Sequence, residues 1–288
     1  MKSSVKPPFD STVKAPSAAA RPTFPVRLKP DAGVPSATKL TATFSRSAST
    51  AALHTLKKIF PTVMPNGVGL DSQSVRARMV HKLAAKGVSD ARVLAAMGLV
   101  ERHRFVDTAL VNQAYEDTSL PIGLGQTISK PNVVARMLEL LRGGAAERLD
   151  ASGRTGRVLE IGTGCGYQAA VLSQLATEVY SIERLRGLHE KARENLRTLR
   201  LPNVHLLFGD GMVGYAKGAP YAAIIAAAGG ESIPPAWIEQ LAIGGRLVAP
   251  LKTTNGAQAL VVIDKTPQGV RQTLLEAVNF VPLKSGTS

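Results

Sequence analysis

The sequence predicts a doubly wound α/β domain with a mostly parallel sheet, an antiparallel edge and an N-terminal helical subdomain. From Arg157 onward, short apolar runs alternate with stretches of helix length, which is typical of βαβ units. The first of these runs leads into a glycine-rich turn and then a helix. Before Arg157, apolar residues recur mainly at helical spacing.

The helical part is expected to begin near Asp71 and to contain three helices. Ser89 can cap the second helix, and the third begins near Pro131. Turn-forming residues are frequent over 115–130, between the second and third helices. The apolar residues that define the first two helices are Val75, Met79, Val80, Leu83, Val93, Leu94 and Met97.

Five apolar runs predict parallel strands, because stretches of helix length separate them. Two later runs lie close together in the sequence and predict an antiparallel pair at one edge. A helix over 168–175 is expected after the first strand. The runs are 157–161, 178–182, 203–208, 221–227 and 246–250 for the parallel strands, and 258–263 and 273–281 for the antiparallel pair.

Residues 1–70 are predicted to form a disordered basic tail. They are rich in Pro, Ala, Ser and Thr, and such a segment cannot bury enough apolar surface to offset the entropy of ordering. Ten Lys and Arg residues and two Asp residues give it +8 of the chain's net charge of +14. A transit peptide and a nucleic-acid contact are the alternatives. The proline density disfavours the first, and the lack of interleaved aromatic residues disfavours the second.

The apolar content and the cysteine count of the chain fit a cytoplasmic protein. The apolar content is 44%, and no apolar run reaches the roughly 18–20 residues needed to span a bilayer. A single cysteine, Cys165, excludes a disulfide within the chain and fits a reducing compartment. We therefore expect a cytoplasmic protein without a membrane segment, and we expect a monomer.

The sharpest local signal is the segment 158–167, which reads Val-Leu-Glu-Ile-Gly-Thr-Gly-Cys-Gly-Tyr. Glycines let a ligand approach the backbone closely, and the N-terminus of the following helix directs free N–H groups at it. The segment therefore predicts a nucleotide-type cofactor. The residues assigned to its binding are Gly162, Thr163, Gly164 and Gly166.

Acidic residues at three strand ends indicate which nucleotide binds. A dinucleotide fingerprint requires a third glycine where Tyr167 stands. Glu160 would repel a pyrophosphate, but it suits the cationic methionine part of S-adenosylmethionine. Glu183 is placed to accept hydrogen bonds from the ribose hydroxyls, and Asp210, followed by Gly211, to bind the adenine amino group.

Other interpretations of these residues remain open. A strand-ending acid is often only a helix cap, and a glycine loop alone is a weak signal. Cys165 is expected to be a small residue tolerated in the turn, because no partner base is evident. No metal site is predicted.

The segment 114–131 resembles the signature of protein-L-isoaspartate(D-aspartate) O-methyltransferases. It reads Ala-Tyr-Glu-Asp-Thr-Ser-Leu-Pro-Ile-Gly-Leu-Gly-Gln-Thr-Ile-Ser-Lys-Pro. The resemblance continues through 160–167, 181–184 and 209–211 and ends with Glu-Ala-Val-Asn-Phe-Val-Pro-Leu at 276–283. It implies a Rossmann-like class I methyltransferase sheet. Residues 71–288 would form the methyltransferase domain, with the substrate segment in its helical part, 71–150, and the cofactor in the α/β core, 151–288.

The resemblance also implies a repair enzyme. The family methylates the α-carboxylate of L-isoaspartyl residues, and less readily of D-aspartyl residues, in damaged proteins. The ester then closes to a succinimide, whose hydrolysis returns some normal aspartate. The family's active-site serine matches Ser129, which the sequence alone would assign as a helix N-cap. The implied substrate-binding residues are Pro121, Ile122, Gly123, Gln126, Thr127 and Ser129.

The implied chemistry requires few catalytic groups. A carboxylate is already ionised at neutral pH, so no general base is needed. The sulfonium already activates the methyl group, and what remains is alignment of the reacting atoms at roughly 3–3.5 Å. Ser129 is expected to orient the carboxylate by a hydrogen bond, not to act as a nucleophile.

Two alternatives and several departures from the family pattern accompany this prediction. The family commonly has Gln where Lys130 stands, and often Asp where Ala222 stands. A methyltransferase acting on a small molecule or RNA is one alternative, but no nucleic-acid binding module is evident. A silent binding protein is the other, and the intact residues Glu160, Glu183, Asp210 and Ser129 argue against it.

Overall fold

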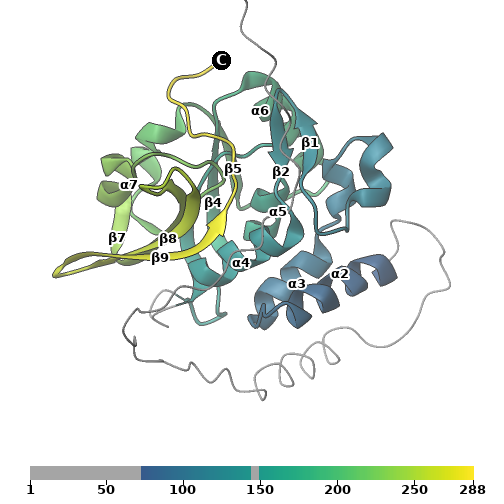
Figure 1. Cartoon of the computed structure of the whole chain (residues 1–288), viewed down its shortest axis with the longest axis horizontal. Helices are drawn as coiled ribbons and strands as arrows, with labels where there is room; N and C mark the ends of the chain where they lie inside the picture. The colour runs from purple at the N-terminus through teal and green to yellow at the C-terminus, as the bar shows by residue number, and fades with distance from the viewer. Residues whose placement is uncertain (1–72, 144–148) are drawn as a thin grey trace, which may run out of the picture. The chain divides into compact units, whose positions relative to one another are not determined.

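The computed structural model describes residues 73–143 and 149–288 (Figure 1). The tail predicted over residues 1–70 lies outside the described residues, and its disorder stays a prediction. No helix within 73–143 or 149–288 is long and apolar enough to cross a membrane.

Seven strands form the main sheet. They are β3 (Thr155–Ile161), β4 (Ala176–Glu183), β5 (Val204–Phe208), β6 (Tyr221–Ala226), β7 (Leu241–Lys252), β8 (Gln258–Thr266) and β9 (Gly269–Val278). Their order is β5-β4-β3-β6-β7-β8-β9. The first five pair in parallel, β8 pairs antiparallel with β7, and β9 pairs antiparallel with β8. The predicted sheet is confirmed.

The order of the strands creates a natural ligand site. From β3 the chain first proceeds outward to β4 and β5, and then returns to the other side of β3 to form β6 and β7. Crevices form at the carboxyl ends of the strands where the winding reverses, here between β3 and β6.

The last strand differs from its predicted bounds. The prediction of a strand over 273–281 is wrong at both ends, because β9 spans Gly269–Val278. Beyond Val278, the N–H of Phe280 donates to Oε1 of the Gln258 side chain, and Nε2 of Gln258 donates to the C=O of Phe280. These side-chain hydrogen bonds replace the backbone hydrogen bonds between strands, so the strand ends there.

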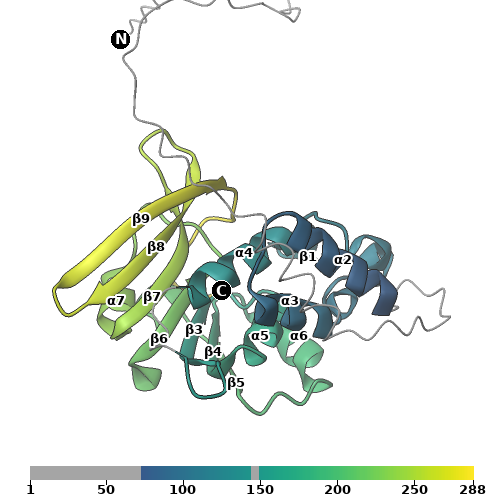
Figure 2. The same cartoon turned by 90° about the horizontal axis from the view of Figure 1, so that it is seen from below.

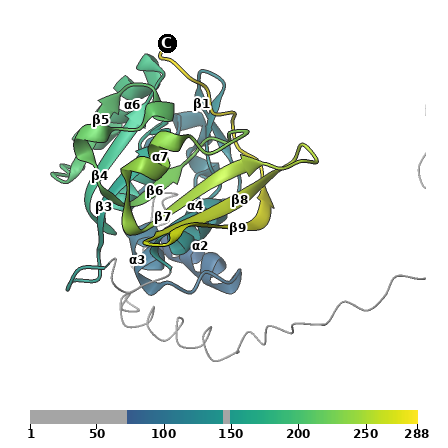
Figure 3. The same cartoon turned by 90° about the vertical axis from the view of Figure 1, so that its left-hand side faces the viewer.

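Helices cover both faces of the sheet. Neighbouring residues on β3 show the alternation: Val158 packs in the apolar layer beneath one set of helices, and Leu159 packs in the opposite layer with Trp237. Figures 2 and 3 show α4 on one side of the sheet and α7 on the other. The helices are α4 (Pro131–Arg142), α5 (Tyr167–Ser173) and α6 (Arg186–Arg197) on one face and α7 (Pro235–Gln240) on the other.

The N-terminal helices pack on the first face. These are α2 (Gln73–Ala85) and α3 (Ala91–Leu99), whose predicted apolar residues are buried, apart from the half-buried Val75. The predicted cap at Ser89 is wrong. Asp90 is the N-cap of α3, and its Oδ1 accepts from Arg92 N at 2.8 Å and Val93 N at 3.2 Å. Ser89 instead donates to Glu139 of α4 through its amide and its hydroxyl.

A small hairpin connects these helices to α4. It consists of β1 (Leu120–Gly123) and β2 (Gln126–Ile128), which pair antiparallel. The two residues between them, Leu124 and Gly125, have φ values of 51° and 70°, as a tight hairpin turn requires. The remaining short elements are 3-10 turns, namely η1 (Arg102–Phe105), η2 (Thr108–Gln113), η4 (Gly211–Val213) and η5 (Ala216–Gly218).

Candidate active site

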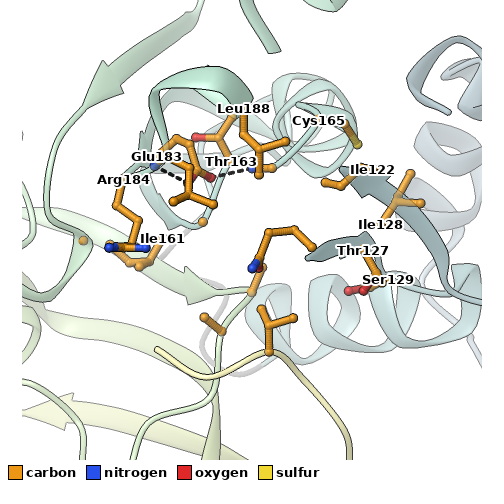
Figure 4. Close-up of a pocket in the computed structure, with 18 of the residues that line it drawn as sticks. Ile122, Thr127, Ile128, Ser129, Ile161, Thr163, Cys165, Glu183, Arg184 and Leu188 are labelled. Carbon is orange, nitrogen blue, oxygen red and sulfur yellow. Dashed lines mark hydrogen bonds between the residues drawn. The ribbon is translucent and has the colours of Figure 1, made fainter. Parts of the chain in front are cut away.

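A cavity of about 430 Å³ lies at the carboxyl ends of β3, β4 and β6, and we call it the first cavity. Its walls come from the β1–β2 hairpin, residues 162–165 of the glycine loop, the end of β4 and the C-terminal segment 281–284. Figure 4 shows Glu183 and Thr163 on one side of it and Ser129 on another. The size lies within the range for small-molecule sites, and the position is the one that the strand order predicts.

The glycine loop is closely packed against its neighbours. Gly164 has φ +57°, and a Cβ there would lie 3.2 Å from Cδ1 of Ile122 on the hairpin. Gly166 has φ +90°, and a Cβ would lie 3.0 Å from Cδ1 of Leu196 on α6. A side chain at either position would therefore be both strained and crowded. The loop leaves its backbone close to the cavity, as a bound nucleotide requires.

Glu183 is fixed at the end of β4. The residue is 5% exposed. Its Oε2 accepts from Gly164 N at 2.9 Å and its Oε1 from Leu185 N at 2.9 Å, the bonds dashed in Figure 4. An ionised carboxylate has about four acceptor positions, so two remain for a ligand. The side chain lines the first cavity.

Glu160 lies beneath the loop and does not line the cavity. The residue is fully buried, and Ser181 Oγ donates to its Oε2. The Ser181 hydroxyl also lies 2.6 Å from Oγ1 of Thr163, which does line the cavity. Oε1 of Glu160 has no hydrogen-bond partner among the described residues. Burial raises the pKa of Glu160 to about 8, against the smaller opposing effect of the Ser181 hydrogen bond.

Asp210 is engaged by protein groups. Its Oδ1 accepts from Met212 N at 2.8 Å and caps η4, and its Oδ2 accepts from Gly286 N at 2.6 Å. It is not among the described residues that line the first cavity, whereas Gly211 is. The contact of Asp210 with adenine stays a prediction.

A second cavity of about 410 Å³ adjoins the first, and the two share Thr127, Ser129, Ala227 and Val281 as lining residues. Ser129 therefore lies where the two cavities meet. The alternative role of Ser129 as N-cap is wrong, because Lys130 is the N-cap of α4 and Pro131 its first residue. Among the described residues the Ser129 hydroxyl has no hydrogen-bond partner, which leaves it available to a ligand.

Comparison with known proteins identifies the chain. The model of the protein-L-isoaspartate(D-aspartate) O-methyltransferase (PCMT) family matches residues 74–288. The chain belongs to this family. A protein-L-isoaspartate O-methyltransferase of Methylibium petroleiphilum is 64% identical over 225 residues, or 77% of this chain and 82% of the relative. One of Leptothrix cholodnii is 60% identical over 227 residues, which are 77% of each chain.

Two solved structures share the fold. A protein-L-isoaspartate O-methyltransferase that is 27% identical superposes with a TM-score of 0.64 over 73% of this chain and 66% of its own. A putative member from Plasmodium falciparum, solved with S-adenosyl-L-homocysteine, is 24% identical. It superposes with a TM-score of 0.62 over 72% of this chain and 97% of its own. The predicted family, enzyme class and fold class are confirmed.

Most of the residues predicted for the PCMT site lie together. Nine of them line the first cavity: Ile122, Gln126, Thr127, Ser129, Gly162, Thr163, Gly164, Glu183 and Gly211. Five lie outside its described lining: Pro121, Gly123, Glu160, Gly166 and Asp210. The individual roles of all fourteen stay predictions.

Sequence reasoning missed part of the lining. Residues 281–284 line the first cavity, although no role was predicted for them beyond the resemblance of 276–283 to the family. Cys165 also lines the cavity, and burial raises the pKa of its thiol to about 11. The thiol stays protonated at neutral pH, as expected of a residue that is no nucleophile. Within 73–143 and 149–288, no group of three His, Cys, Asp or Glu side chains could hold a metal ion.

Proposed function

We propose that this protein transfers a methyl group from S-adenosylmethionine to the α-carboxylate of L-isoaspartyl residues, and less readily of D-aspartyl residues. The product ester starts repair of the damaged protein through a succinimide. One observation carries this proposal: Ser129 stands on the wall shared by two cavities. A methyl donor in the first cavity and a peptide in the second would meet at its hydroxyl.

The first cavity suits the methyl donor. The two acceptor positions that remain on Glu183 would accept hydrogen bonds from the ribose hydroxyls. Glu183 ends β4, the second strand of the main sheet in chain order, where this fold binds a ribose. Loop residues Gly162, Thr163, Gly164 and Gly166 would lie along the methionine part. Glu160 would support that loop through Ser181, with its negative charge favoured by a nearby sulfonium. Asp210 and Gly211 would lie beside the adenine.

The groups in the first cavity fit methyl transfer without a base. Burial raises the pKa of Cys165 to about 11 and that of Tyr167 to about 12, so neither releases a proton near neutrality. A substrate carboxylate needs none, because it is already an anion. The Ser129 hydroxyl would donate to one carboxylate oxygen and leave the other to attack the methyl carbon. Alignment of the reacting atoms then supplies the rate enhancement.

The wider setting of the enzyme follows from the chain as a whole. We place the methyltransferase domain at residues 71–288, in accord with the family match over 74–288. Its partners are damaged proteins and peptides that contain isoaspartyl sites. We propose a cytoplasmic protein, since its single cysteine is free and buried, and we propose that it acts as a monomer. Most of the excess positive charge lies in residues 1–70, so we propose no dedicated nucleic-acid surface on the folded part.

Repair itself provides the test. An isoaspartyl peptide is incubated with the protein and S-adenosylmethionine, and normal aspartyl peptide is followed by chromatography over many rounds of methylation. We expect aspartyl peptide to accumulate only when both protein and methyl donor are present. A peptide that stays isoaspartyl and unmethylated would contradict the proposal.

A further inference from the structure

The second cavity is lined mostly by uncharged residues. Among the described residues that line it, Lys130 alone is charged. The others are apolar or neutral polar residues, and they include Ser119, Val133, Asn279 and Phe280. Methyl transfer as proposed above makes no use of this ammonium group.

Lys130 makes no ion pair with the described residues. Asp117 is close enough for the charge of Lys130 to act on it. Both oxygens of Asp117 have other partners, because Oδ1 accepts from Asn132 N at 2.9 Å and Oδ2 pairs with Lys86. Lys130 is exposed and belongs to the lining of the second cavity. A ligand there would therefore displace no described protein partner from its ammonium.

Lys130 also lies close to the reacting centre. It directly follows Ser129, so their Cα atoms are about 3.8 Å apart. As the N-cap of α4 it has φ −58° and ψ 146°, and it makes no side-chain capping bond. If Ser129 holds the isoaspartyl carboxylate, the residues beside that site in the substrate lie within reach of the Lys130 ammonium.

We propose that Lys130 gives the enzyme a preference for isoaspartyl sites that have an aspartate or glutamate beside them. The second cavity holds these neighbouring residues, and the ammonium pairs with their carboxylates. This inference rests on the proposed function. Charge complementarity supports it, because a cation that is the only charged group among the described lining residues attracts anions and repels cations.

The preference should be modest and sensitive to salt. Exposed ion pairs contribute little free energy. We therefore expect kcat/KM for a peptide with an acidic neighbour to exceed that for its neutral counterpart by only about twofold to fivefold. The Debye length falls from about 8 Å at physiological ionic strength to about 3 Å at 1 M salt, so the preference should fade at high salt.

The experiment compares matched isoaspartyl peptides. In each pair, one peptide carries glutamate beside the isoaspartyl site and the other carries glutamine. One pair has this residue immediately before the site, and a second pair has it immediately after the site. The measured quantity is the ratio of kcat/KM for the glutamate and glutamine peptides. The variants are Lys130→Gln and Lys130→Arg, and Lys217→Gln removes an equal charge from an exposed 3-10 turn outside both cavities.

We expect the wild type, Lys130→Arg and Lys217→Gln to prefer glutamate at one or both positions, and Lys130→Gln to lose that preference. The same ratio in the wild type and Lys130→Gln would overturn the inference. Equal loss of activity on both peptides would also overturn it, because Lys130 would then act on the methylated carboxylate itself. If no isoaspartyl peptide is methylated by the wild type, the proposed function fails instead.

Discussion

The amide of Gly164 donates a hydrogen bond of 2.9 Å to Oε2 of Glu183. This bond ties the centre of the glycine loop to the end of β4, across 19 residues of sequence. The glycine loop and the acidic residue Glu183, which most strongly predict a nucleotide site, are thus joined in one structural unit. Glu183 has two roles in it, since it fixes the loop and presents free acceptor positions to the first cavity.

Substitution of Glu183 should weaken cofactor binding. We expect Glu183→Ala to reduce the affinity for S-adenosylmethionine by about 1.5–3 kcal/mol, the usual value of hydrogen bonds to a charged group. Titration calorimetry measures this directly. Glu178→Ala is the matched control, because Glu178 lies on the same strand and pairs with Arg157 at the surface. Unchanged affinity in Glu183→Ala would refute the ribose role.

Substitution of Ser129 should separate turnover from cofactor binding. We expect Ser129→Ala to lower kcat by about 10- to 100-fold, the equivalent of one hydrogen bond to a charged group. Cofactor affinity should change far less. Thermal stability should stay within about 0.5 kcal/mol of the wild type, because the hydroxyl has no hydrogen-bond partner among the described residues. A Ser129→Ala variant that melts at a lower temperature but turns over normally would show that Ser129 has only a structural role.

Asp90 should matter more for stability than its neighbour Ser89. Asp90 caps α3 through Oδ1 and accepts from the nearly buried Arg142 at 2.8 Å through Oδ2. We expect Asp90→Ala to cost about 2–3 kcal/mol of the free energy of unfolding, because both the cap and the carboxylate partner of Arg142 are lost. Ser89→Ala should cost less than about 1 kcal/mol. Urea unfolding compares the two variants, and a larger loss for Ser89→Ala would contradict the structure.

Glu160 should make the unliganded protein less stable as the pH rises. Burial raises its folded-state pKa from 4.5 to about 8. Between about pH 5 and pH 8 the folded state keeps a proton that the unfolded state has released. Stability is therefore lost across this window, by at most about 1.4 kcal/mol per pH unit.

Glu160→Gln isolates this effect, because it keeps the shape of the side chain and does not titrate. Its free energy of unfolding, relative to the wild type, should increase from pH 5 to pH 8 by a few kcal/mol. Denaturant unfolding at both pH values, without cofactor, measures the difference. A constant difference between the two proteins would show that Glu160 does not titrate in this range.

Local sequence patterns predicted the sheet well and individual contacts less well. Apolar runs mark strands such as β3 and β6 because both faces of the sheet are buried. Ser89 and Asp90 are both good cap residues, and only the packing of α3 against α4 decides between them. Asp210 meets Gly286, 76 residues away, a contact that no local pattern encodes. Likewise, the burial of Glu160 depends on its register with Ser181 on the next strand.

Methyl transfer to a pair of twin peptides measures whether the enzyme distinguishes isoaspartyl from normal aspartyl residues. One peptide contains an L-isoaspartyl residue and the other a normal aspartyl residue at the same position, and both are incubated with labelled S-adenosylmethionine. We expect label on the isoaspartyl peptide and almost none on its twin. Equal labelling of the two peptides, or labelling of neither, would contradict the proposed isoaspartyl methylation.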